Sequence, residues 1–417
     1  MNHASGYPAA RASGDNYLMG AAFALFCGLV LVRFIVNANV LDTVIKYSAE
    51  GGSIIEKIHP SSYGLAVVLL IMLFSCRIEL SEWDLRALRS FVVFTTVIAV
   101  LSALMWSSGR SGSAGYLIDS YVMSCVAGAI MLTFPPAWRE MVGTMLIVFI
   151  AVSACVALGE FALHKRLLPY WATEVSFRPT GLTEHPLMLG LFSATAVSFV
   201  ALTRWRTPTR VGVTIVLLLG AFAAGARWAA IGAAASALAV LMFSEWPSVS
   251  RARLVQIKLL SLIAVAVAIP VALAVLIQLG LVSRFQEGLF DDSAMARVKI
   301  YGLFGLVSWN EILFGADIDR IRTLALEHFD LEFIESSLVM FVFQFGLFGA
   351  VTFLLFFART IFVLLSGAGR YAALGTAVFF IVASSNNALS SKTPIVLMIV
   401  LLIVAFHGRS STRARYS

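Results

Sequence analysis

The sequence predicts an all-α, polytopic integral membrane protein with about 12 transmembrane helices in a single membrane domain, residues 1–417. Apolar residues make up 60% of the chain and charged residues only 13%, and the mean hydropathy is +0.91. This composition excludes a soluble globular domain, in which about a quarter of the residues are charged. Apolar windows long enough to cross roughly 30 Å of hydrocarbon recur along the whole chain.

The windows follow one another with short polar connections. Residues 1–16 are polar, and no small-residue cleavage pattern follows the first window, so we expect a retained helix and not a signal peptide. The run from 211 to 243 has 33 apolar-rich residues, about 50 Å as one helix, and we therefore expect a break at Gly225-Ala226-Arg227. The predicted spans are 17–36, 62–76, 91–106, 116–134, 141–163, 187–203, 211–225, 228–243, 257–282, 335–358, 371–388 and 394–407.

Positive charge predicts the orientation of these spans. An even number of crossings puts both termini on one side, and that side receives 16 Lys and Arg but only six Asp and Glu, for a net charge of +10. The other side has a net charge of −3. The positive-inside rule therefore predicts cytoplasmic termini. The cations are spread over short loops, so the basicity indicates orientation and not nucleic-acid binding.

Two outward-facing segments are too long to be simple turns, residues 164–186 and 283–334. Connections longer than about 15 residues are usually functional or disordered. We expect the first to form an active-site loop. We expect the second to contain an amphipathic helix at the membrane surface, because its hydrophobic residues recur at helical spacing: Ile300, Tyr301, Leu303, Phe304, Leu306, Val307 and Trp309.

Two arginines are candidate ligands for an anion. Arg178 precedes a turn containing Pro179 and Gly181 and could bind a phosphate, although loop arginines also commonly extend toward lipid headgroups. Arg227 is the lone charge inside the run of apolar residues, where a charge costs on the order of 3 kcal/mol. Its partner would be a phosphate or, alternatively, a buried carboxylate such as Glu160 or Glu184.

The remaining candidates lie near the same two outward segments. Arg297 could also bind an anion, or form a local salt bridge with nearby acidic residues. His185 and His328 are candidate bases, but a histidine before a proline, as at His185, more often begins a helix. Glu335 either favours a helix amino terminus or serves as a base whose pKa is raised by partial burial. The four cysteines lie in or beside apolar runs and predict neither a disulfide framework nor a metal site.

Three blocks resemble the O-antigen ligase and polysaccharide polymerase superfamily of bacterial inner-membrane glycosyltransferases. Residues 177–190 are similar to an Arg-x-x-Gly-x-x-x-His-Pro signature, and Gly225-Ala226-Arg227-Trp228-Ala229 is similar to a Ser-Arg-Gly-Ala block. The third block is Arg297, a long helix to Leu313-Phe314-Gly315, and the segment Gln344–Gly349. The resemblance covers about residues 150–360.

The resemblance implies glycosyl transfer from a polyprenyl-diphosphate-linked saccharide to a hydroxyl of an acceptor glycan on the periplasmic face, with inversion and without a metal or cofactor. Arg178, Arg227 and Arg297 would hold the diphosphate. Ligases of the family have a His-Asn pair where this chain has Glu335-Ser336, so Glu335 or His328 would replace that base. This departure favours an exopolysaccharide or capsule polymerase, with a chain-length regulator or flippase as possible partners.

Two alternatives stay open. A ligase would use the same donor chemistry and transfer the glycan to lipid A core. A transporter or flippase for lipid-linked sugars would also fit 12 spans, but it should show related halves and broken helices at corresponding positions. No internal repeat is evident in this sequence.

Overall fold

The computed structural model describes residues 9–48, 53, 55–75, 78–110, 114–170, 177–243, 250, 252–253, 255–260, 263 and 298–408. This part of the chain is helical and contains no strand. Its first half contains α1 (Ala9–Ile35), α2 (Ala38–Leu41), α3 (Pro60–Ser75), α4 (Glu82–Ser107), α5 (Ala114–Tyr116), the π-helix η2 (Leu117–Val122), α6 (Met123–Thr133), α7 (Pro136–Leu163), α8 (Pro186–Val200), α9 (Thr207–Ala223) and α10 (Arg227–Phe243). Its second half contains the 3-10 helix η3 (Ile300–Gly305), α14 (Trp309–Phe314), α15 (Ile318–Phe329), α16 (Ser337–Leu365), α17 (Arg370–Ala383), the 3-10 helix η4 (Ala388–Ser390) and α18 (Ile395–Ala405).

Four helices in the described ranges are long and apolar enough to cross a membrane: Tyr17–Ile35 within α1, α4, α7 and α16. Seven shorter apolar helices, of 10 to 17 residues, coincide with further predicted windows. The all-helical fold class is thus confirmed for the described residues, and the long apolar helices support a membrane protein. The window 257–282 lies mostly outside the described residues, and the count of 12 crossings stays a prediction.

Helices α8 and α18 form the centre of the bundle. Every residue of α18 is buried, as are all but one of α8, and a helix that is apolar all round belongs in an interior. Helices α7, α9, α10 and α17 pack around α8. Gly190 allows α10 to approach closely, because a Cβ there would lie 2.8 Å from the Cβ of Ala226. The loop that precedes α8 is therefore attached to a rigid element.

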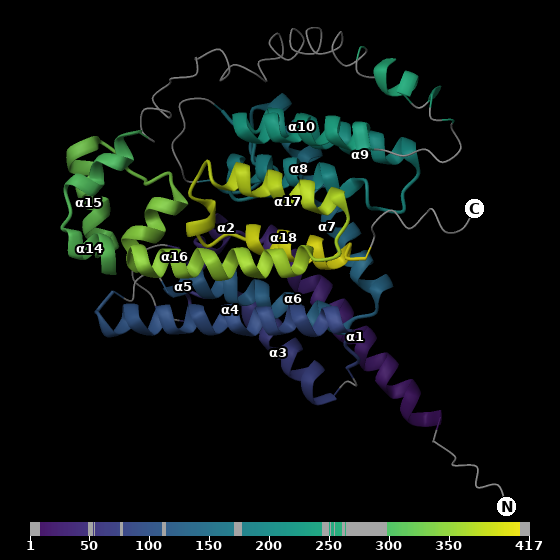
Figure 1. Cartoon of the computed structure of the whole chain (residues 1–417), viewed down its shortest axis with the longest axis horizontal. Helices are drawn as coiled ribbons and strands as arrows, with labels where there is room; N and C mark the ends of the chain where they lie inside the picture. The colour runs from purple at the N-terminus through teal and green to yellow at the C-terminus, as the bar shows by residue number, and fades with distance from the viewer. Residues whose placement is uncertain are drawn as a thin grey trace, which may run out of the picture.

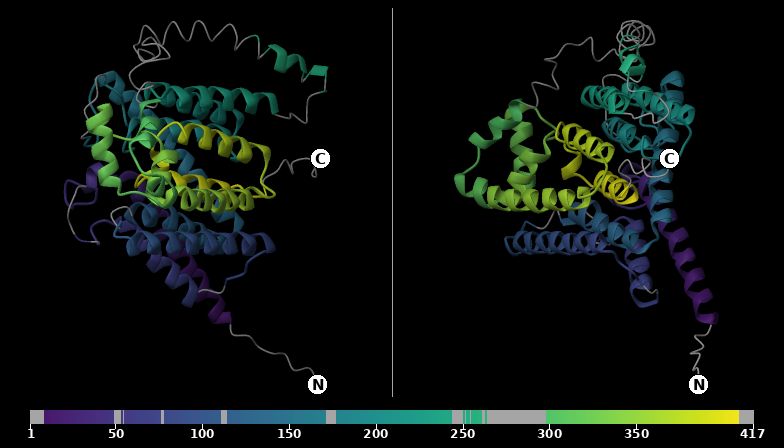
Figure 2. Two further views of the ribbon diagram at one scale, coloured as in Figure 1. Left: turned by 60° about the vertical axis from the view of Figure 1, so that its left-hand side comes forward. Right: turned by 45° about the vertical axis from the view of Figure 1, so that its right-hand side comes forward.

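The connections gather at two ends of the bundle, and Figure 1 shows α14 and α15 at the left end. At the left end, Asn39 donates to the Glu184 carbonyl and Arg110 to the Phe314 carbonyl. We call this the Arg178 end. At the opposite end, the Arg139 end, Arg370 donates to the Phe243 carbonyl. In both views of Figure 2, α14 and α15 are the green helices at one edge of the bundle.

The long apolar run from 211 to 243 is broken as the sequence predicts. Helix α9 ends at Ala223 and α10 begins at Arg227. Between them Gly225 has φ +61°, a left-handed conformation that residues with a Cβ adopt only at a cost. The prediction of a break here is confirmed, and it places Arg227 in the first turn of a helix at the Arg178 end.

The segment before α16 differs from the prediction. The residues expected to form one amphipathic helix instead form the short 3-10 helix η3, followed by α14, and the amphipathic helix is α15. The expectation of a long helix running to Leu313-Phe314-Gly315 is therefore wrong. The physical reason is tertiary: η3, α15 and the first half of α16 bury a separate small core that contains Ile300, Ile321 and Phe343.

Helix α16 is interrupted where this small core meets the bundle. Gly346 has φ +74° and is not helical, and a Cβ at this position would lie 2.3 Å from the Leu313 carbonyl oxygen. The Ala316 N–H donates to the Phe343 carbonyl at 2.6 Å. The glycine therefore serves the close docking of α14 against α16, and two parts of the third block of the sequence resemblance are in contact.

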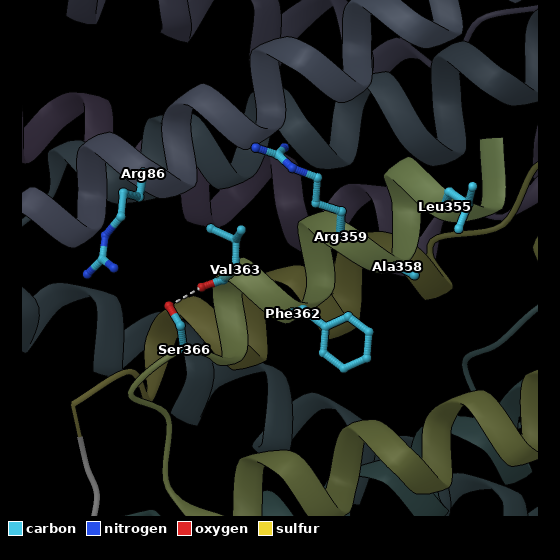
Figure 3. Close-up of a pocket in the computed structure, with 7 residues that line it drawn as sticks. All are labelled: Arg86, Leu355, Ala358, Arg359, Phe362, Val363 and Ser366. Atoms are coloured by element: carbon cyan, nitrogen blue, oxygen red, sulfur yellow. Dashed lines mark hydrogen bonds between the residues drawn. The ribbon is translucent and has the colours of Figure 1, made fainter. Parts of the chain in front are cut away.

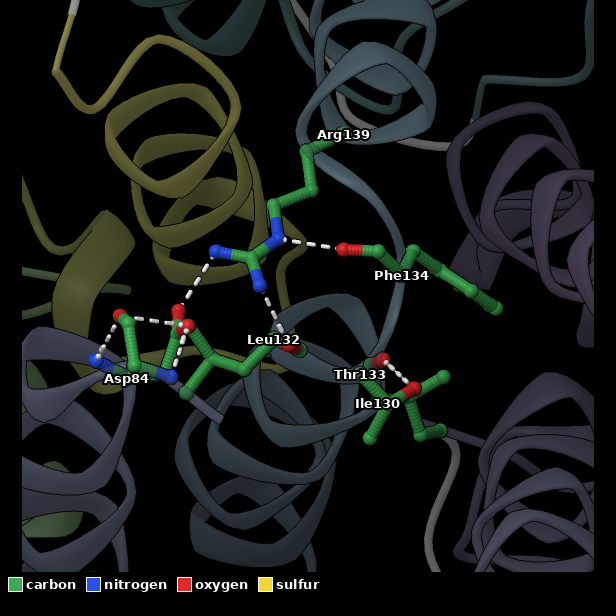
Figure 4. A network of polar contacts seen from close by, with 7 residues as sticks. Asp84, Ile130, Leu132, Thr133, Phe134 and Arg139 are labelled. Atoms are coloured by element: carbon green, nitrogen blue, oxygen red, sulfur yellow. Dashed lines mark hydrogen bonds and ion pairs between the residues drawn. The ribbon is translucent and has the colours of Figure 1, made fainter. Parts of the chain in front are cut away.

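A buried ion pair fixes the Arg139 end. The Arg139 guanidinium contacts Asp84 at 2.5 Å and also donates to the carbonyls of Phe134 and Leu132, as Figure 4 shows. Asp84 belongs to the capping box that begins α4, with Ser81 as the cap. One guanidinium thus ties the start of α4 to the turn between α6 and α7.

Candidate active site

The loop from Phe177 to Pro186 is held by a carboxylate from α7. Glu160 is buried, and its two oxygens accept the backbone N–H groups of Leu167 at 2.7 Å and of Thr180 and Gly181, each at 2.8 Å. Three of the roughly four acceptor positions of this carboxylate are thus used in shaping the loop.

Gly181 forms the predicted turn against α7. It has φ +57°, and a Cβ at this position would lie 2.3 Å from the Ser153 carbonyl oxygen. The next residue, Leu182, donates its N–H to the Ser153 hydroxyl at 2.9 Å. No side chain fits between this turn and α7, so the glycine fixes how deeply the loop sits in the bundle.

We expect Gly181→Ala to displace the loop. The added methyl combines a left-handed backbone with a clash against a main-chain oxygen, and the free energy of unfolding should fall by roughly 1–3 kcal/mol. Thermal unfolding in detergent measures this. Gly159→Ala, an exposed position near the same end of α7, is the control, because a Cβ there meets nothing within 4 Å. Equal melting temperatures for the two variants would contradict the role given to Gly181.

The structure brings the loop of Arg178 to the joint that precedes Arg227. Arg178 is 8% exposed, and its Nε donates to the Ala224 carbonyl at 3.0 Å. A Cβ at Gly225 would lie 3.3 Å from the same nitrogen, so the glycine leaves room for the guanidinium. Arg227, the first residue of α10, is half-buried two positions further on. Arg178 and Arg227, two of the three predicted anion ligands, therefore lie on segments that a hydrogen bond joins.

A third cation in this region is Arg166, which the sequence reasoning did not select. Its Nε and Nη2 donate to the Arg178 carbonyl at 3.1 and 2.9 Å. Its guanidinium lies 3.9 Å from the centre of the Tyr170 ring and 5.1 Å from that of Phe177, which are favourable cation–π distances. Arg166 thus clamps the loop and adds positive charge beside Arg178.

His185 begins α8, as a histidine before proline favours. Its Nδ1 accepts the Leu187 N–H at 3.1 Å, and His185 is the N-cap. Burial, followed by the charges of Arg178 and Arg166, lowers the pKa of His185 to about 3. The imidazole is therefore neutral near pH 7, and one ring nitrogen is already occupied by the helix.

The other candidates lie in three different situations. Arg297 lies outside the described residues. His328 is exposed in the last turn of α15. Glu335 is half-buried just before Ser336, the N-cap of α16. The neighbouring Ser337 donates its hydroxyl to the Asn386 carbonyl at 3.0 Å, which places Glu335 beside the segment between α17 and α18.

A buried polar cluster, absent from the sequence predictions, joins this segment to α1, α3 and η2. Asp119 of η2 accepts the Tyr47 hydroxyl at 2.9 Å, the His59 N–H at 3.0 Å and the Ser62 hydroxyl at 2.7 Å. Lys392 donates to the Tyr47 carbonyl at 2.8 Å. The short π-helix that carries Asp119 is a feature found frequently at functional sites.

Arg33 completes the polar cluster. It lies in the last turn of α1, is 2% exposed, and donates from Nη2 to the Lys392 carbonyl at 3.2 Å. Burial, followed by the charge of Arg33, lowers the pKa of His59 to about 3. The signal for Arg33 was present in the sequence, because it is a lone charge in an apolar window, as Arg227 is.

A separate groove lies at the Arg139 end, between α4 and α16. Figure 3 shows that Arg86 and Arg359 flank it and that Leu355, Phe362 and Val363 form its apolar wall. Its volume is about 530 Å³. It is not continuous with the loop of Arg178, which lies at the other end of the bundle.

Among the residues that the structure describes, no three His, Cys, Asp or Glu side chains are grouped so that they could hold a metal ion. No protein-family model matches the chain, and no curated protein or solved structure matches it.

Proposed function

We propose that this protein transfers a glycan from a polyprenyl-diphosphate-linked saccharide to a hydroxyl of an acceptor glycan. The observation that carries the proposal is the hydrogen bond between Arg178 and the Ala224 carbonyl, because it joins the loop of Arg178 to the turn that leads into Arg227. Two guanidiniums on neighbouring segments are suited to a diphosphate, because each guanidinium can donate two parallel N–H groups to two oxygens of a phosphate. Arg297 is a third ligand in this proposal.

The reaction needs little more than charge stabilisation and positioning. A lipid diphosphate is a good leaving group, and the arginines neutralise the negative charge that develops on it. The acceptor hydroxyl attacks the anomeric carbon from the opposite side, so a single displacement inverts the configuration. A carboxylate or imidazole at the same end, such as Glu335, His328 or His185, takes the hydroxyl proton. No cofactor is required by this chemistry.

The proposed setting is the bacterial inner membrane, with both termini in the cytoplasm and the Arg178 end facing the periplasm. The distribution of cations supports it through the positive-inside rule. Polymerisation of a polysaccharide is the favoured outcome, and ligation to lipid A core is the alternative, since both use the same donor.

The test uses purified protein in detergent with lipid-linked oligosaccharides extracted from cells that lack the gene. We expect release of polyprenyl diphosphate together with longer glycans, without any ion gradient. Arg227→Ala should lower the rate about 100-fold, as loss of one well-placed donor does. A ladder of repeat units indicates a polymerase, and a glycan attached to added lipid A core indicates a ligase. Unchanged donor in the wild-type reaction would contradict glycosyl transfer.

A transporter or flippase is the second candidate, and the break of α16 at Gly346 favours it, because broken helices are typical of transporter sites. This break is filled by α14 and therefore has a packing explanation. Proteoliposomes loaded with fluorescent lipid-linked sugar separate the two functions. Movement of the probe between leaflets without release of diphosphate would favour the transporter.

A further inference from the structure

Glu184 has a carboxyl group that is held on one side only. It lies in the loop of Arg178, and its carbonyl accepts the Asn39 side chain at 3.0 Å. The backbone N–H of Ala38, at the start of α2, donates to its carboxylate. The other oxygen, Oε2, is buried and has no hydrogen-bond partner within the described ranges, although the residue as a whole is half-buried.

Arg33 is near enough for its charge to lower the pKa of Glu184, and it has unused donors. Nη2 is occupied by the Lys392 carbonyl, but Nε and Nη1 are buried and have no hydrogen-bond partner among the described residues. The charge of Arg33 acts on the Glu184 carboxyl, yet the two side chains form no ion pair in this part of the chain. Buried charged groups with unsatisfied atoms are costly, and a catalytic role is one of the reasons for which such groups are retained.

The chemistry of these atoms identifies the kind of group that would satisfy them. A carboxylate oxygen accepts a hydrogen bond and guanidinium nitrogens donate, so the complementary group must do both. A sugar hydroxyl does this, because it has one O–H donor and two acceptor lone pairs. Asn37, 3% exposed, adds an amide nitrogen that also has no partner among the described residues. Several donors and one acceptor suit a polyhydroxylated ligand.

We propose that Glu184 is the proton acceptor for the hydroxyl of the acceptor glycan, and that Arg33 positions that hydroxyl. This inference rests on the proposed glycosyl transfer. The hydroxyl oxygen forms a bond to the anomeric carbon while the bond from that carbon to the phosphate oxygen breaks. The electron pair of the broken bond leaves with the lipid diphosphate, which Arg178 neutralises. The hydroxyl proton moves to Oε2 of Glu184.

The position of Glu184 in the loop agrees with this role. It lies six residues after Arg178, and the charge of Arg178 reaches the adjacent His185. The same loop would thus supply the charge that stabilises the leaving group and the base that activates the nucleophile. Glu160 and Gly181 hold both in one rigid unit.

The acidity of Glu184 suits a base that works near neutral pH. Burial raises the pKa of Glu184 to about 7, against the lowering effects of Arg33 and the Ala38 N–H, and Asp42 raises it further. The charge of Glu184 in turn helps to raise the pKa of the Tyr47 hydroxyl, which donates to Asp119. The base must be ionised to accept a proton, so the rate should rise as pH increases through about 7 and then level off.

The decisive variant is Glu184→Gln, assayed with the lipid-linked oligosaccharides described above. We expect the rate of transfer to fall at least 100-fold, which is typical of the loss of a general base, and the rise with pH to disappear. Binding of undecaprenyl diphosphate, measured by calorimetry, should stay within a few-fold of wild type. Glu332→Gln, an exposed glutamate at the same end, is the matched control and should behave as wild type.

A second variant tests Arg33 in case Glu184→Gln fails to fold. Arg33→Gln removes a charge that lowers the pKa of Glu184, so the midpoint of the pH–rate profile should move to higher pH, whereas Arg33→Lys should largely restore it. A purely structural role for Arg33 would change stability without moving the midpoint.

The outcomes separate this inference from the proposed function. An active wild-type protein with Glu184→Gln near the wild-type rate, or with the pH dependence lost in Glu335→Gln instead, overturns the role of Glu184 while glycosyl transfer stands. An inactive wild-type protein that still binds undecaprenyl diphosphate overturns glycosyl transfer itself. Loss of rate and of pH dependence in Glu184→Gln alone, with diphosphate binding retained, supports both.

Discussion

Arg178→Ala is expected to lower the rate of glycosyl transfer by about 100- to 1000-fold, the loss seen when one preorganised donor to a developing anion is removed. The guanidinium is buried and aimed by the Ala224 carbonyl, so little of its charge is screened by water. Binding of undecaprenyl diphosphate should weaken in parallel, because the ligand carries the charge that Arg178 neutralises. Release of polyprenyl diphosphate and calorimetry measure the two effects.

Two further substitutions sharpen this prediction. Arg178→Lys keeps the charge but loses the fork of parallel N–H donors, so it should restore less than a tenth of the lost rate. Arg206→Ala removes an exposed arginine between α8 and α9, at the opposite end, and should leave the rate unchanged. Wild-type diphosphate binding by a folded Arg178→Ala protein would remove Arg178 from the site.

Arg139→Ala should cause the largest loss of stability. The substitution leaves the Asp84 carboxylate buried without its cation and removes the donor to the carbonyls of Leu132 and Phe134. Breaking a buried pair from one side costs about 3–5 kcal/mol of unfolding free energy. Unfolding of the detergent-solubilised protein by sodium dodecyl sulfate measures this difference.

The chain provides a matched control for this experiment. Arg204 pairs with Glu140 at 2.8 Å, but the Arg204 side chain is 71% exposed, so Arg204→Ala should cost only about 0–1 kcal/mol. Adding Asp84→Asn to Arg139→Ala should recover part of the loss, since no uncompensated charge is then buried. Equal losses for the Arg139 and Arg204 variants would contradict the role assigned to burial.

Local sequence patterns predicted the features that depend on local physics. The length of the run from 211 to 243 required a break, and Gly225 supplies the left-handed residue at that break. Pro186 marked the start of α8, with His185 as its N-cap. Bilayer thickness limits one span to about 20 residues, and proline fixes the backbone at its own position. Both effects can therefore be recognised in a short stretch of sequence.

Helix lengths and the large outward segment were harder to predict. The apolar pattern around Ile300 indicated one long amphipathic helix, but the chain forms η3, α14 and α15. Helices η3 and α15 pack with α16 around Phe343, and α14 docks on α16 at Gly346. Periodicity cannot separate one long helix from several short ones when tertiary contacts decide where each ends. The same contacts require the break at Gly346, which lies within an apolar window that shows no helix end.

For the candidate site, the sequence by itself determined that a helical protein rich in apolar helices places Arg178 and Arg227 beside turns at the ends of those helices. Only the tertiary structure decided which groups surround them. Arg33 and the Lys392 carbonyl are 359 residues apart, and Asn39 and the Glu184 carbonyl are 145 apart. A buried charge signals in the sequence that it needs a partner, because desolvation is costly. The identity of that partner depends on helix packing, which brings together residues that no local pattern connects.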